Sequence, residues 1–151
     1  MQVISLENNS EQRNRIRCAL DMAGEAYSLT EVGSLDEVRT LEGSDAFDLA
    51  LIGDRDLDAI LTALVFLRGR MPCAHLIACA EVPSYDSSTT RRLRDAGADL
   101  IFDSRSSPTL LARVINHFVR PRLAQDSDPG LMPSWVARRA LQSLAPGAIG
   151  E

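Results

Sequence analysis

The chain contains no lysine, and all 16 of its basic residues are arginines. Any mechanism that needs a lysine ammonium is therefore excluded. Cysteine is also scarce: Cys18, Cys73 and Cys79 cannot all pair, and they form no C-x-x-C motif and no Cys/His cluster. This pattern argues against a structural zinc site and favours reduced thiols, so we expect a cytoplasmic protein.

Long apolar runs are missing as well. Runs such as Ala63–Leu67 fall far short of the roughly 20 residues that a membrane span needs. No charged-then-apolar leader opens the chain, because Met1–Leu6 runs straight into Glu7 and Asn8, so we expect neither export nor a membrane partner. The net charge of −5 and the pI of about 5.0 make the chain as a whole an unfavourable ligand for nucleic acid.

What the sequence does contain is typical of one globular domain with an appendage: 151 residues, 45% of them hydrophobic and 25% charged. Short apolar runs predict five strands, at Val3–Leu6, Ala26–Val32, Phe47–Ile52, Ala74–Cys79 and Asp99–Phe102. Helical spacing and capping residues predict five helices. The first is capped by Asn9 or Ser10 and ended by Gly24, and the second runs from Ser34 to Gly43. The third has the apolar stripe Leu57, Ile60, Leu61, Leu64 and Val65 before Gly69, the fourth spans Thr89–Ala96, and the fifth spans Pro108–Arg120 with Ser107 as its cap.

This alternation predicts a parallel sheet covered by helices on both faces. In such sheets the functional site lies outside the carboxyl ends of the strands, where the strand order reverses. The loops expected to carry it are therefore Glu7–Asn9, Gly53–Asp56, Ala80–Ser84 and Asp103–Ser106.

The character of the sequence changes after Arg120. Residues 1–120 are expected to form the domain, residues 121–133 a linker, and residues 134–145 a short amphipathic helix with Trp135, Leu141 and Leu144 as its apolar residues. About twelve residues do not hold a helix alone in water, so this segment must dock on the domain, pair with another chain, or belong to a longer output region.

The string Pro-Ser-Trp-Val-Ala-Arg-Arg-Ala-Leu at residues 133–141 is faintly similar to the opening helix of AraC-type DNA-binding regions. No recognition helix follows it, so DNA binding by this chain alone is not expected. Trp135 is better interpreted as a docking anchor, on the same chain or on another.

Two strings carry a stronger resemblance: Phe-Asp-Leu-Ala-Leu-Ile-Gly-Asp at residues 47–54 and Asp-Ala-Gly-Ala-Asp-Leu-Ile-Phe at residues 95–102. In their order and spacing, residues 1–120 resemble the CheY-like receiver domain of response regulators. The resemblance implies a flavodoxin-like α/β fold, doubly wound, with five parallel strands in the order 2-1-3-4-5. It also implies a signalling role in two-component signal transduction and no enzymatic activity.

Receivers are phosphorylated on an aspartate after the third strand. There an acidic pair helps to bind Mg²⁺, and a Thr or Ser and a Lys bind the phosphoryl oxygens. Carried over to this sequence, the acidic pair falls on Glu7 and Asn8 and the acceptor on Gly53. The Thr/Ser position falls on Cys79 and the Lys position on Ser104, with Arg105 beside it. The aromatic switch position falls near Ile101, next to Phe102.

The sequence is therefore interpreted as a degenerate, pseudo-receiver domain that signals by protein–protein interaction or dimerisation, without phosphorylation, cofactor or metal. Three alternatives stay open. One is an active receiver phosphorylated at Asp54, with Glu7 helping to bind Mg²⁺ and Arg105 replacing the lysine. Another is a small enzyme on this fold, and the third is the N-terminal regulatory part of a transcriptional regulator. We favour a structural role for Asp54 and Asp56 at the start of the third helix, and a solvated loop for Glu7 and Asn8.

Arginines gather on the predicted fourth and fifth helices. In receivers the face made by these helices and the fifth strand mediates dimerisation and partner docking. We expect the interaction face to include Arg91, Arg92, Arg94 and Arg113, with Arg120 and Trp135 beyond them, although a merely solvated face accounts for these arginines equally well. The three cysteines, together with His75 and His117, are expected to have no chemical role.

Overall fold

The computed structural model describes residues 1–24, 26–41, 46–81 and 88–119. Its strands are β1 (Gln2–Leu6), β2 (Ser28–Val32), β3 (Leu49–Gly53), β4 (His75–Ala80) and β5 (Leu100–Asp103). Its α-helices are α1 (Ser10–Met22), α2 (Leu35–Thr40), α3 (Leu57–Arg70), α4 (Ser88–Ala96) and α5 (Pro108–Val114). All strand pairs are parallel and their order is β2-β1-β3-β4-β5, which confirms the predicted fold class.

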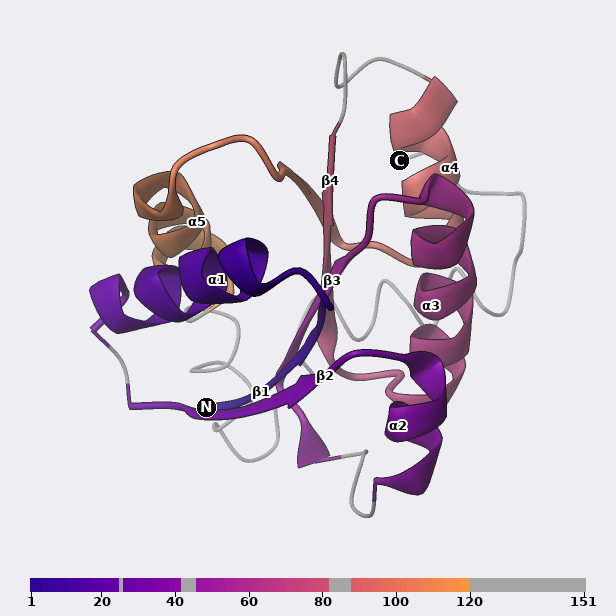
Figure 1. Cartoon of the computed structure of the whole chain (residues 1–151), viewed down its shortest axis with the longest axis horizontal. Coiled ribbons are helices and arrows are strands. Elements are labelled where there is room, and N and C mark those ends of the chain that lie inside the picture. Colours follow the sequence, from indigo (N-terminus) through magenta and orange to yellow (C-terminus); the bar gives the residue numbers. More distant parts are fainter. Residues whose placement is uncertain (25, 42–45, 82–87, 120–151) are drawn as a thin grey trace, which may run out of the picture.

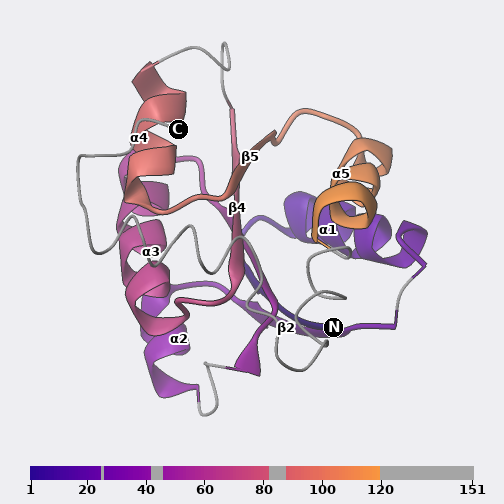
Figure 2. The ribbon, with the colours of Figure 1, turned by 180° about the vertical axis from the view of Figure 1, so that it is seen from behind.

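The helices form two layers around this sheet. Helices α1 and α5 lie side by side on one face, and α2, α3 and α4 cover the other (Figures 1 and 2). The strand order reverses between β1 and β3, so the chain leaves the ends of these neighbouring strands toward opposite faces. The site of interest is therefore the edge of the sheet where β1 and β3 end.

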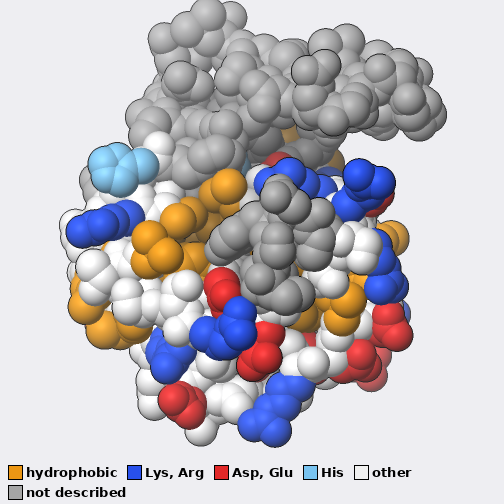
Figure 3. All heavy atoms as spheres, turned by 90° about the horizontal axis from the view of Figure 1, so that it is seen from above, with side chains coloured by type: hydrophobic (Ala, Val, Ile, Leu, Met, Phe, Trp, Pro, Cys, Tyr) orange, Lys and Arg blue, Asp and Glu red, His pale blue; other side chains and the backbone are white. Residues whose placement is uncertain are grey.

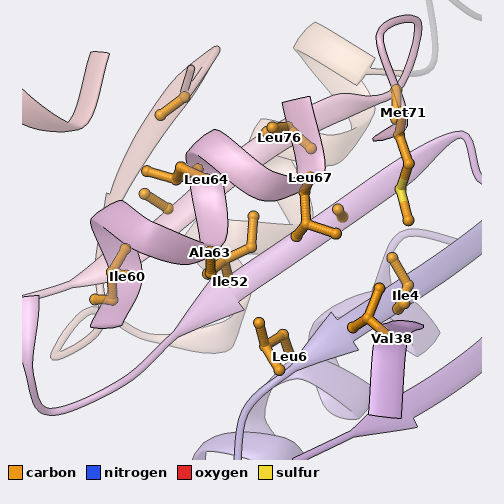
Figure 4. Close-up of a cluster of buried hydrophobic side chains, with 14 of the residues drawn as sticks. Ile4, Leu6, Val38, Ile52, Ile60, Ala63, Leu64, Leu67, Met71 and Leu76 are labelled. Atoms are coloured by element: carbon orange, nitrogen blue, oxygen red, sulfur yellow. The ribbon is translucent and has the colours of Figure 1, made fainter. Parts of the chain in front are cut away.

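The core is divided by the sheet into two apolar clusters. Every residue of β3 and β4 is buried, as expected for central strands covered on both faces. On the α2–α3–α4 side, side chains from β1, β3 and α3 pack together, among them Leu6, Ile52, Ile60 and Leu64 (Figure 4). This packing fixes the strand ends that carry the candidate site.

Two helices begin at the capping residues that the sequence predicted. The Asn9 side chain accepts a hydrogen bond from the backbone of Gln12 at the start of α1, and Ser34 accepts one from Glu37 at the start of α2. Gly24, with φ of 75°, follows α1 in the left-handed conformation that favours glycine.

Several predicted details are wrong. The second strand begins at Ser28 rather than Ala26, and α3 continues through Gly69 to Arg70. Val65 is 63% exposed and so lies outside the apolar stripe of α3. Ser107 occupies the cap position of α5 but its side chain makes no capping bond.

The end of the predicted last helix is altered too. Helix α5 passes into a π-helical turn at Ile115–Val119. Gly43, the proposed linker (121–133) and the proposed short helix (134–145) lie outside the described residues. Within the part of the chain that the structure describes, no helix is both long and apolar enough to cross a lipid bilayer.

Candidate functional site

The ends of β1, β3, β4 and β5 bring the predicted pocket residues to one edge of the sheet. Leu6 of β1 is in register with Ile52 of β3, so Glu7 follows beside Gly53. Gly53 in turn pairs with Cys79 of β4, and Cys79 pairs with Phe102 of β5. The structure thus brings Glu7, Gly53 and Cys79 to neighbouring strand ends.

Glu7 is buried, with only 6% of its surface exposed, which corrects the expected solvated loop. Its Oε1 atom accepts a hydrogen bond from the backbone N–H of Asn9 at 3.1 Å. Burial raises the pKa of the Glu7 carboxyl above its ordinary value, and the nearby Asp54 carboxylate raises it further. The backbone N–H groups of Asn9 and Asn8 oppose this pKa shift in part, because they stabilise the ionised form.

The Glu7 carboxylate occupies the space that a side chain at Gly53 would take. A Cβ atom built on Gly53 would lie 2.2 Å from Oε2 of Glu7 and 3.3 Å from the backbone oxygen of Cys79. Real Cβ atoms essentially never approach another heavy atom closer than 3.0 Å. The place where a receiver's acceptor side chain would begin is therefore filled by Glu7.

Asp54 is exposed and belongs to the turn that leads into α3. Its Oδ1 atom accepts a hydrogen bond from the backbone N–H of Asp56 at 2.9 Å. Asp56 is the N-cap of α3 and accepts a bond from the backbone N–H of Asp58 at 3.1 Å. Both carboxylates thus have the structural roles that were favoured for them at this helix start.

Cys79 is buried on the α1–α5 side of the sheet, packed in the cluster that includes Phe102 and Leu111. Burial, with a smaller contribution from Glu7, raises the pKa of the Cys79 thiol to about 12. The group is therefore a neutral thiol at physiological pH, a weak hydrogen-bond donor and a poor nucleophile.

Ser104 and Arg105 follow β5 at the remaining corner of the pocket. The backbone oxygen of Ser104 accepts a hydrogen bond from Nη1 of Arg15 at 3.0 Å. Arg105 forms an ion pair with Asp103 at 2.8 Å, and its guanidinium holds the pKa of that carboxyl below its usual range. The guanidinium of Arg105, the residue after the lysine position, is thus engaged with the carboxylate at the end of β5.

The described residues also contain no group of three or more His, Cys, Asp or Glu side chains arranged to hold a metal ion. Glu7, Asn8, Gly53 and Asp54 instead line a hollow beside the pocket, which also reaches the first turns of α2 and α3.

The arginines of the predicted interaction face are exposed but do not form one uninterrupted strip. Arg91 and Arg94 of α4 and Arg113 of α5 are exposed. Arg92 forms an ion pair of 3.4 Å with Asp58 and therefore lies toward α3. Ile101 is half-buried against the α2–α3–α4 cluster, while the adjacent Phe102 is buried on the other face. Arg120 and Trp135 lie outside the described residues.

One polar network behind this face was not predicted. Arg68 of α3 donates hydrogen bonds to the backbone oxygens of Ala74 at 2.9 Å and Gly97 at 2.6 Å, and to the carboxylate of Asp99 at 2.8 Å. Asp99 also accepts a bond from the backbone N–H of Leu76. This network ties the connection between α4 and β5 to α3 and β4, and no local pattern around Arg68 indicates it.

The burial of Glu7 was also missed, although a signal for it exists. In the parallel register of β1 and β3, the residue after Leu6 comes beside the residue after Ile52, and that residue is a glycine. A glycine there leaves room for a long side chain from the neighbouring strand end.

No protein-family model matches the sequence, and no curated protein matches it. Solved structures do match. A protein of Burkholderia thailandensis named for pilus assembly, CpaE, is 24% identical, with a TM-score of 0.62, over 76% of this chain and 93% of that one. An orphan response regulator of H. pylori is 22% identical, with a TM-score of 0.57, over 76% of this chain and 92% of that one.

An atypical orphan response regulator is also similar, at 21% identity and a TM-score of 0.61, over 80% of this chain and 96% of that one. Its structure is described as revealing a phosphorylation-independent regulatory mechanism. Similarity at this level of identity concerns the fold. Together with the strand order and the helix layers, it shows that this chain has the receiver fold of CheY-like response regulators.

Proposed function

We propose that this chain is a receiver-like signalling domain that acts by protein–protein contact and does not use aspartyl phosphorylation. The observation that carries the proposal is the position of Glu7. Its carboxylate oxygen lies 2.2 Å from where the Cβ of a residue-53 side chain would be, so the acceptor position holds no acceptor and no space for one.

The surrounding groups support the same conclusion. Asp54, the alternative acceptor, is exposed and engaged in the turn before α3. Arg105 is paired with Asp103, and Cys79 is a neutral, buried thiol. A phosphoryl group at this edge would meet the carboxylates of Glu7 and Asp54 without a lysine ammonium to offset the charge.

The phosphorylation-independent regulation described for one structural neighbour offers a precedent for such a domain. In this chain we assign the contact surface to the α4–β5–α5 face. It offers the exposed side chains of Arg91, Arg94 and Arg113, and β5 is an edge strand of the sheet. The Arg68 network holds the α4–β5 connection in one arrangement, which suits a surface that is permanently available. An acidic partner or the acidic side chains of a second copy would match its charge.

Phosphorylation is tested by incubating the full chain with a small phosphodonor and Mg²⁺, followed by intact mass measurement. We expect no mass increase corresponding to a phosphoryl group. An adduct that disappears in Asp54→Ala would overturn the proposal and establish an active receiver instead.

The surface is tested with the double variant Arg91→Glu/Arg94→Glu, compared with wild type in capture of partners from the native cell and in sedimentation velocity. The matched control is Arg39→Glu/Arg55→Glu, which makes the same charge change on α2 and in the turn before α3. We expect partner capture or self-association to fall at least tenfold in the first variant and to be unchanged in the control. An equal loss in both variants, or in neither, would refute the assignment of this face.

A further inference from the structure

A hollow of about 490 Å³ lies between the ends of β1 and β3 and the first turns of α2 and α3. Its walls include apolar side chains from each of these elements, chiefly Leu6, Leu35, Ile52, Ile60 and Ala63. Figure 4 shows four of them, Leu6, Ile52, Ile60 and Ala63, on the α2–α3–α4 side of the sheet. A hollow of this size and lining can accept a large apolar side chain with its neighbours.

The mouth of the hollow is acidic. The exposed carboxylates of Asp54, Asp56 and Asp58 line the hollow together with the buried Glu7, and Asp58 also forms an ion pair with Arg92. Figure 3, which views the edge where the strands end, shows acidic side chains gathered near the middle of that edge, with basic side chains among them. A segment that fits this hollow therefore has an apolar side chain that contacts the apolar walls and positive charges that contact the carboxylates.

We propose that this hollow is the docking site of the chain's own C-terminal segment, residues 134–145, with Trp135 against the apolar walls and Arg138 and Arg139 facing the carboxylates. The segment has the required chemistry. It contains the single tryptophan of the chain, and no acidic residue occurs between Pro129 and Gly150. Its two arginines come three and four residues after Trp135, close enough to engage the mouth of the hollow when the indole is inside.

The length of the intervening chain allows this contact. Residues 120–133, which connect the described domain to the segment, span up to roughly 45 Å when extended. A domain of about 120 residues is roughly 35 Å across, so the connection can pass from the end of α5 to the strand ends. Tethering through a connection of this length gives the segment an effective concentration on the order of 1 mM, enough for a weak peptide site to be mostly filled.

The inference is independent of the proposed function. The hollow lies beside β1 and β3, whereas the α4–β5–α5 face lies at the other end of the sheet. A docked segment would cover the acceptor position and leave the arginines of α4 and α5 free. Phosphorylation assays and partner capture therefore do not decide whether the segment docks.

Trp135 supplies the measurement, because it is the only tryptophan. The full chain is excited at the red edge of the absorption band, where tyrosine contributes nothing, and its fluorescence is quenched with acrylamide, a neutral quencher. We expect a quenching constant at least threefold smaller than that of a synthetic peptide covering residues 129–151.

Two kinds of variant locate the contact. Ala59→Tyr fills the hollow from its half-exposed wall, and Val65→Tyr makes a similar change on the exposed outer side of α3. We expect Ala59→Tyr to restore the quenching constant of the free peptide and Val65→Tyr to leave the wild-type value. Arg138→Glu/Arg139→Glu changes no residue of the walls of the hollow, and it is expected to expose Trp135 in the same way as Ala59→Tyr.

The proposal is overturned if Trp135 in the wild type is as accessible as in the peptide. It is equally overturned if Trp135 is protected in Ala59→Tyr, which would place the segment elsewhere. Protection that appears only on raising the protein concentration, together with dimers in sedimentation velocity, would assign the hollow to the segment of a second copy and refute docking within one chain.

Discussion

Replacing Gly53 by alanine adds a single methyl group at the point where Glu7 fills the acceptor position. The new Cβ would lie 2.2 Å from Oε2 of Glu7, and it needs at least 3.0 Å. The carboxylate, at the end of a flexible side chain, must therefore leave its place, and the adjacent hollow gives it a route to water. We expect the Glu7 side chain to be expelled and its pKa to return to the ordinary value.

The magnitude combines three effects. Glu7 loses the hydrogen bond from Asn9, and the methyl group also crowds the backbone oxygen of Cys79 at 3.3 Å, which together cost about 1–3 kcal/mol. Reduced entropy of the unfolded chain returns about 0.4–1 kcal/mol. The ionised Glu7 carboxylate also regains its hydration, which increases the free energy of unfolding by an amount that depends on pH.

The sign of that gain follows from the raised pKa of Glu7. Because folding raises this pKa, Glu7 in the wild type contributes stability at pH values below its unfolded pKa, and that stability is lost as the pH rises through the folded pKa. In Gly53→Ala the expelled Glu7 no longer lowers the stability as the pH rises. The variant should therefore be less stable than wild type by about 1–2 kcal/mol at pH 4, with a smaller difference at pH 7.

Two measurements check this reasoning: urea unfolding at several pH values, followed by circular dichroism, and an NMR titration of the Glu7 carboxyl carbon. Gly69→Ala is the matched control, since a Cβ there meets nothing within 4 Å and the residue lies inside α3. That control should gain about 0.5–1 kcal/mol at every pH. A Glu7 pKa that remains raised in Gly53→Ala would show that the carboxylate does not occupy the acceptor position.

Three further predictions concern other parts of the domain. Arg68→Met should lower the free energy of unfolding by about 2–4 kcal/mol in urea titrations because it removes several hydrogen bonds to partly buried acceptors, whereas Arg92→Met, at an exposed ion pair, should cost at most about 0.5 kcal/mol. Asn9→Ala should cost about 1 kcal/mol by removing the N-cap of α1, with the loss absent in Asn9→Asp. In native protein at pH 8, iodoacetamide should add two labels by mass, on the two exposed cysteines, and spare Cys79, whose thiol has a pKa of about 12; a third label without unfolding would contradict its burial.

The sheet could be predicted because its central strands are unbroken runs of apolar residues in the sequence. The run from Leu49 to Gly53 is buried throughout, and unbroken apolar runs are typical of strands covered on both faces. Capping by Asn9, Ser34 and Asp56 likewise depends on residues close in sequence, so local pattern suffices.

The errors arose where tertiary packing outweighs local preference. Gly69 does not end α3, because the helix is held by burial of Leu64 and Leu67, which outweighs the roughly 1 kcal/mol that an interior glycine costs. Val65 matches the apolar spacing of α3 but lies past the edge of the buried stripe. Arg68 could not be predicted, since the groups it binds come from segments up to 31 residues away in sequence.

Glu7 and Gly53 show why the candidate site needed the structure. From the sequence, an absent acceptor and a surviving carboxylate are two separate observations. In the fold these two observations have one cause, because the absence of a side chain at Gly53 leaves a space that the Glu7 carboxylate fills.

Introducing an aspartate at position 53 alone would therefore not create a phosphorylation site. The new carboxylate would meet the buried carboxylate of Glu7, with the exposed Asp54 nearby; because like charges repel, one of them must take up a proton or move out. Only a variant that also shortens Glu7 leaves the acceptor room, and even then the chain has no lysine to bind the phosphoryl oxygens.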